Sequence, residues 1–209
     1  MRIKYVIYFI LVLLIINCKG QSQKENECNN NYNQAQKLVN EFVLIRDTIS
    51  LQKALNLYSK SMNCSQMRKK SIEKKLLYIN LIEDFEQGLS FVDSLSVSDF
   101  DKEYKKKMYL DFYNAKMFEK KGEIVERDRY YTLIIDNIMV YLNGFTKDMI
   151  DKEAYYDLYF IKSQYLSEKT ILEEIENLER SYPKYHLYFN SLKNMFTNVD
   201  DKISEPEFD

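Results

Sequence analysis

Residues that interrupt helices are scarce in this chain. Its 209 residues include four Gly and two Pro, the residue types that most often punctuate a fold with turns. Strands joined into hairpins need such turn residues at short intervals, and the sequence supplies few of them. The shortage therefore favours helices connected by short turns.

Apolar residues recur every three or four positions along most of the chain, which places them on one face of an α-helix. The stripe is clear over residues 32–45 and 131–142 and continues to residue 195. Breaks in it fall at Asn63, at 94–101, at Gly122, at 143–144, at Ser167 and at 181–183. The pattern predicts one all-α domain of about eight or nine helices over residues 32–197.

The N-terminus has the layout of an export signal. Arg2 and Lys4 precede an uninterrupted apolar run over residues 5–16, shorter than the about 20 residues that a membrane-spanning helix needs. A charged start, a short apolar region and then small or polar residues are typical of secretory signal peptides. We expect residues 1–17 to be such a signal, with cleavage after Gly20 as the alternative to cleavage before Cys18.

The four residues Ile15-Ile16-Asn17-Cys18 resemble the lipobox of bacterial lipoproteins, in which the Cys is acylated and becomes the new N-terminus. The resemblance implies a lipidated Cys18, a polar tether over residues 18–31 and stable membrane anchoring, which two or more acyl chains provide. Lys19 in place of Asp is similar to lipoproteins sent on to the outer membrane. We therefore expect an outer-membrane lipoprotein, on either its periplasmic or its surface face.

The other two cysteines form an even pair in a chain that we expect to be exported. Cys28 and Cys64 remain once Cys18 is acylated, and an exported protein meets conditions that permit disulfides. We predict a Cys28–Cys64 disulfide, with two free buried thiols as the alternative. Metal binding is a poor competitor, because no His lies near either residue.

Composition argues against catalysis and against nucleic acid as a partner. The formal net charge is −2, whereas phosphate binding needs a basic face. His186 is the only histidine, which largely excludes His-centred triads and multi-His metal sites. No phosphate-binding or zinc-protease motif occurs. We expect no enzyme, no cofactor and no metal.

Two segments repeat at a separation of 34 residues. The stretches QKALNLYSKSM (52–62) and FEQGLSFVDSL (85–95) contain small residues at Ala54 and Gly88, which are 34 positions apart. This period and the small residue in a second helix resemble tetratricopeptide repeats. The resemblance implies a right-handed solenoid of stacked helical hairpins, whose concave groove binds protein or peptide segments.

These observations favour a lipid-anchored protein-binding scaffold or assembly factor of a bacterial envelope, with an envelope protein or peptide as its partner. The alternative is a surface lipoprotein that captures a small ligand or a glycan. Tyr155, Tyr156 and Tyr159, on adjoining turns, are the best candidates for lining a groove, because Tyr gives contact area at low entropy cost. Residues 198–209 are acidic and lack an apolar stripe, so we expect a flexible tail.

Replacing Cys18 by Ala tests the lipoprotein interpretation. Without the acylated thiol, we expect the protein to leave the membrane fraction or to accumulate as uncleaved precursor. Fractionation and mass spectrometry of the N-terminus measure both effects. Unchanged membrane association together with an unchanged mature N-terminus would contradict lipidation of Cys18.

Overall fold

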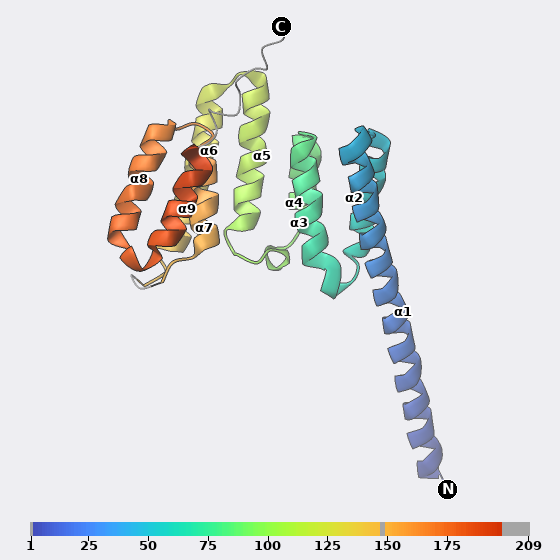
Figure 1. Cartoon of the computed structure of the whole chain (residues 1–209). Coiled ribbons are helices and arrows are strands. Elements are labelled where there is room, and N and C mark those ends of the chain that lie inside the picture. The colour runs from blue at the N-terminus through green and yellow to red at the C-terminus, as the bar shows by residue number, and fades with distance from the viewer. Residues whose placement is uncertain (1, 147–148, 198–209) are drawn as a thin grey trace. The chain divides into compact units, whose positions relative to one another are not determined.

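A computed structural model describes residues 2–146 and 149–197 and places side chains within them from Lys24 onward. Every regular element in these ranges is helical, which confirms the predicted all-α fold (Figure 1). The described residues form nine α-helices and two short 3-10 helices. The side chains of the predicted signal peptide and of Cys18, and the whole predicted tail 198–209, lie outside this description.

The chain divides into two compact units, Met1–Asp101 and Lys102–Asp209, where the sequence predicts one helical domain. The first unit contains α1 (Arg2–Ile45), α2 (Thr48–Ser61), α3 (Ser65–Leu81), α4 (Phe85–Asp93) and η1 (Val97–Asp99). The second contains α5 (Lys105–Lys121), α6 (Ile124–Leu142), α7 (Lys152–Lys162), α8 (Glu168–Ser181), η2 (Pro183–Tyr185) and α9 (His186–Thr197).

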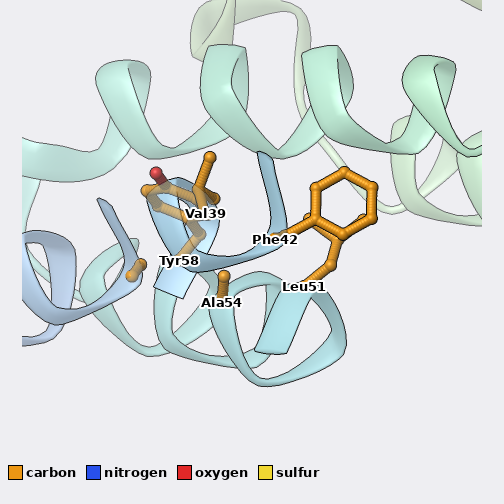
Figure 2. Close-up of a cluster of buried hydrophobic side chains, with 6 residues drawn as sticks. Val39, Phe42, Leu51, Ala54 and Tyr58 are labelled. Carbon is orange, nitrogen blue, oxygen red and sulfur yellow. The ribbon is translucent and has the colours of Figure 1, made fainter. Parts of the chain in front are cut away.

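The core of the first unit is built where α1 packs along α2. Figure 2 shows Val39 and Phe42 of α1 facing Leu51, Ala54 and Tyr58 of α2, and all five side chains are buried. A small residue at Ala54 lets the two helices approach closely, and Gly88 is likewise buried in α4. The two small residues of the sequence repeat thus both lie inside the unit.

The helices begin and end at chemically identifiable signals. Asp47 accepts hydrogen bonds from the amides of Ile49 and Ser50 at the start of α2, and Asp84 caps α4 through the amide of Gln87. Such side-chain acceptors satisfy amides that have no partner within the helix. Gly122 ends α5 with a positive φ of 75°, a conformation that Gly adopts without steric cost.

A salt bridge joins α3 to the segment that follows α4. Both Nε and Nη2 of Arg68 donate to the carboxylate of Asp99, with an Nη2–Oδ2 distance of 2.8 Å. Asp99 also accepts from the Ser96 amide at 3.0 Å. The hydrogen bonds from Arg68 outweigh the effect of burial and hold the pKa of Asp99 well below its ordinary value. Arg68 is therefore committed to the fold rather than to an external anion.

The second unit is assembled from neighbouring pairs, because α6 packs on both α5 and α7, and α8 packs on α9. Tyr131, Ile134 and Ile138 form the buried face of α6, and Ile175 and Phe189 are buried in α8 and α9. All of these except Phe189 belong to the apolar stripes of the sequence. The buried face of α6 is the one that the periodicity predicts, whereas α9 buries Phe189 and leaves Met195 of the predicted stripe 57% exposed.

Cys28 and Cys64 form the predicted disulfide, with their Cα atoms 6.2 Å apart. Cys28 lies inside α1 and is buried, so residues 24–31 are part of the first unit and the predicted domain start at residue 32 falls within a helix. Cys64 stands at the N-terminus of α3. The bond therefore fixes α1 to α3 directly.

The disulfide should stabilise the protein through the loop that it closes. We expect Cys64→Ala to lower the free energy of unfolding by about 4 kcal/mol, the cost of releasing a loop of this size in the chain-entropy model. Chemical denaturation of both proteins measures the difference. In the presence of a strong reductant the wild type and the variant should converge; a difference that persists there would show that the bond is not its source.

Candidate binding pocket

The three tyrosines expected to line a groove have different surroundings. Tyr155 and Tyr159 are only 9% and 2% exposed, and Tyr155 packs edge-on against Phe189 at a ring-centroid distance of 5.7 Å. These two are core residues and line no open surface, which corrects the expectation for them. Tyr156 points outward and is 40% exposed.

Tyr156 lines a pocket of about 700 Å³ that we call the α7–α9 pocket. Its apolar lining residues are Tyr156, Phe160, Leu166, Ile171, Met195 and Phe196. They come from α7, from the turn after it, from the first part of α8 and from the end of α9. The size falls within the range of about 300–1,000 Å³ that is typical of ligand sites.

Two aromatic rings form one wall of the pocket. Tyr156 and Phe160 lie one helical turn apart on α7, with ring centroids 6.4 Å apart and an interplanar angle of 19°. Phe160 is 41% exposed, and Met195 on α9 is 57% exposed. Large apolar side chains that remain in water and gather around one hollow are a recognised sign of a binding surface.

The polar groups of the pocket are few. Ser163, Gln164 and Glu168 contribute to the lining. Ser163 and Gln164 each donate to the carbonyl oxygen of Phe160, so their donors are partly committed to α7. Among the described residues that line the pocket, Glu168 is the only charged one. The site therefore offers apolar contact and one carboxylate.

The start of α7, which carries the aromatic wall, is fixed by Asp151. The Asp151 carboxylate caps the helix by accepting from the amides of Glu153 and Ala154. It also accepts from Lys102 Nζ at 2.6 Å and from the Tyr141 hydroxyl at 2.9 Å. Burial opposes ionisation of Asp151, but these hydrogen bonds outweigh it and lower its pKa. The α7 position is thus tied to α6 and to the start of the second unit.

Buried tyrosine adds a second tie between α7 and its neighbours. The Tyr104 hydroxyl donates to Asp157 at 2.7 Å, and Asn137 of α6 donates to the Tyr104 carbonyl at 3.0 Å. Burial and the adjacent Asp157 carboxylate raise the pKa of Tyr104 far above its ordinary value, so the hydroxyl remains a donor. Through Tyr104, the helix that carries the pocket wall is thereby hydrogen-bonded to α6.

Other candidate sites offer less. His186 is exposed, and its Nδ1 contacts the carboxylate of Glu179, which also contacts Lys193 at 2.8 Å. No group of three or more His, Cys, Asp and Glu in the described part of the chain is arranged to hold a metal ion. A hollow of about 470 Å³ beside Thr48 and Gln52 is lined by α2 alone. A ligand there would contact the protein on one side only.

Comparison with known proteins gives no match: no family model, no curated protein and no solved structure is similar to this chain. Within the part of the chain whose side chains are described, no helix combines the length and the apolarity needed to cross a membrane. The site is therefore interpreted from its own geometry.

The sequence identified Tyr156 as a candidate but missed its neighbours. Phe160 is four residues further along α7, the spacing that places two side chains on the same helix face, so this partner had a detectable signal. Met195 and Phe196 had none, because only tertiary packing brings the end of α9 to α7. Tyr155 and Tyr159 occupy the adjoining, buried face of the same helix.

Two buried tyrosines allow a matched test of the network. The Tyr131 hydroxyl is buried with no hydrogen-bond partner among the described residues, whereas the Tyr104 hydroxyl donates to a carboxylate. We expect Tyr131→Phe to raise the free energy of unfolding by about 1 kcal/mol, and Tyr104→Phe to lower it by about 1.5–3 kcal/mol. Urea denaturation measures both. Equal losses in the two variants would contradict the hydrogen-bond assignment.

Proposed function

We propose that this protein is a lipid-anchored helical-repeat scaffold or assembly factor of a bacterial envelope, which binds a segment of a protein partner. The observation that carries the binding role is the α7–α9 pocket, where exposed Tyr156, Phe160 and Met195 surround one hollow. An apolar pocket with few polar groups and no catalytic constellation suits recognition better than chemistry.

The anchor and the location are supported by the sequence and are consistent with the disulfide. The Ile15-Ile16-Asn17-Cys18 stretch is similar to a lipobox, and a Cys28–Cys64 bond suits an exported protein, since disulfides persist outside the reducing cytosol. Anchoring at a membrane raises the effective concentration of a tethered partner. A modest affinity at the pocket would then suffice for function.

A tetratricopeptide-like arrangement is the proposed form of the helical stack. In the first unit α1 packs on α2, α2 packs on α3, and α1 also meets α3, the neighbour pattern of stacked helical hairpins. Ala54 and Gly88 are both buried in the second helix of a pair. These contacts support a repeat of helical pairs, in which each pair buries one face on the next.

Capture of a small ligand or a glycan is the second candidate function. It is favoured by the size of the α7–α9 pocket, which is also typical of small-molecule sites, and by the aromatic wall. The chain contains no Trp to serve as a sugar-stacking platform. Thermal stabilisation by a small molecule, with no protein partner recovered, would favour this candidate.

The pocket variant Tyr156→Ala/Phe160→Ala tests the proposed function. Tyr156 and Phe160 are 40% and 41% exposed, so we expect the variant to fold with a lowered melting temperature and to lose partner binding. Crosslinking in intact cells followed by affinity purification of the full-length protein measures the loss of a stoichiometric partner.

The matched control is Phe118→Ala/Tyr130→Ala. These residues also form a stacked pair, with centroids 5.6 Å apart, but neither lines the pocket. We expect this control to retain the partner. Equal recovery of the partner by both double variants would place the binding surface elsewhere.

A further inference from the structure

The charge of the α7–α9 pocket is one-sided. Glu168 lines it, and no Lys or Arg is among its described lining residues. Glu168 follows Ser167, whose side chain caps α8 by accepting from the Thr170 amide at 3.2 Å. The N-terminus of a helix carries the equivalent of about half a positive charge. The full negative charge of the carboxylate exceeds it, so the rim of the pocket is net negative.

Basic residues next to the pocket do not cancel this charge. Lys162 on α7 forms an ion pair with Glu174, and Lys193 on α9 forms one with Glu179. Lys169, the residue after Glu168, lies 3.9 Å from the carboxylate of Glu173. Screening leaves attraction between exposed charges effective over about 8–10 Å at physiological ionic strength. A positively charged group approaching the rim of the pocket is therefore favoured over a neutral or negative one.

The walls of the pocket suit a cation on an apolar stem. Tyr156 and Phe160 present nearly parallel rings, and the face of an aromatic ring attracts Lys or Arg. Met195 and Ile171 add apolar surface beside them. Lys and Arg side chains place a methylene stem on apolar surface while the charged head reaches a polar partner. Glu168, the Gln164 side-chain oxygen and the hydroxyls of Ser163 and Tyr156 are acceptors among the lining residues.

From this arrangement we infer that the α7–α9 pocket receives a Lys or Arg side chain of the partner polypeptide. The stem lies against Tyr156, Phe160 and Met195, and the head faces Glu168. The inference rests on the proposed function and names the chemistry of the partner residue. The other occupants, a purely apolar side chain or residues 198–209 of this chain, are distinguished by the experiment below.

Random 12-residue peptides displayed on phage are selected for binding to the immobilised full-length protein. Peptides that also bind the Tyr156→Ala/Phe160→Ala variant are removed by counter-selection. Synthetic copies of the selected peptides are then compared with copies whose Lys is acetylated or whose Arg is replaced by citrulline, which removes the charge and keeps the stem. We expect the selected peptides to contain Lys or Arg and to bind about tenfold more weakly once the charge is removed.

Glu168→Gln should weaken the same peptides about threefold to tenfold, since the head group loses its charged partner. Glu176→Gln is the matched control: it makes the same charge change on the same helix, at an exposed residue outside the pocket lining, and should alter affinity less than twofold. Equal effects of the two variants would overturn the assignment of Glu168.

The remaining outcomes separate the inference from the proposed function. Peptides that depend on Tyr156 and Phe160 but not on their own charge would overturn the inference and leave a polypeptide-binding pocket. Binding seen only after truncation at Thr197 would assign the pocket to residues 198–209 of this chain and overturn the inference. If no selected peptide depends on Tyr156 and Phe160, either in the full-length protein or in the protein truncated after Thr197, both the inference and the proposed function fail.

Discussion

Burial between helix pairs is the constraint on which the rest of this protein depends. A helix as short as α2 or α7 is marginal in water alone, and each has one apolar face to bury. In the first unit that face is covered when Val39 and Phe42 meet Leu51 and Ala54 (Figure 2). Caps, salt bridges and turns then set where each helix begins. The fold itself is determined by the packing of helix pairs on their apolar faces.

Much of this pairing could be read from the sequence, because the periodicity of apolar residues directly encodes which face is buried. The turns at Gly122 and before α8 were visible for the same local reason: a Gly at positive φ and a Ser cap. The turns at Arg46 and Glu83 were not among the predicted breaks. Both residues adopt a positive φ without being Gly, so composition gives no warning of them. The division into two units also depends on long-range contacts that no local pattern encodes.

The candidate site shows the same division between local and tertiary information. Tyr155, Tyr156 and Tyr159 are similar in composition and adjacent in sequence, yet the first and third are core residues and only Tyr156 reaches the pocket. The helical repeat rotates successive side chains by about 100°, so neighbours must have different environments. The sequence does not reveal how α7 is rotated about its own axis relative to α6 and α9, and this rotation decides which of its side chains are buried. Asp151 and Asp157 fix that helix through bonds to residues about 50 positions away.

The Cys28–Cys64 bond also decides how this protein carries mechanical load. Tension applied at the N-terminal end of α1 reaches Cys28 and then has a covalent route to Cys64, which avoids the chain between them. The end of α1 and all of α2 lie within that bypassed loop. They are spared the tension, which passes directly into α3. A pull that would otherwise peel α1 from α2 instead meets the first unit at the start of its third helix, so the hairpin in Figure 2 stays closed under load while the disulfide is intact.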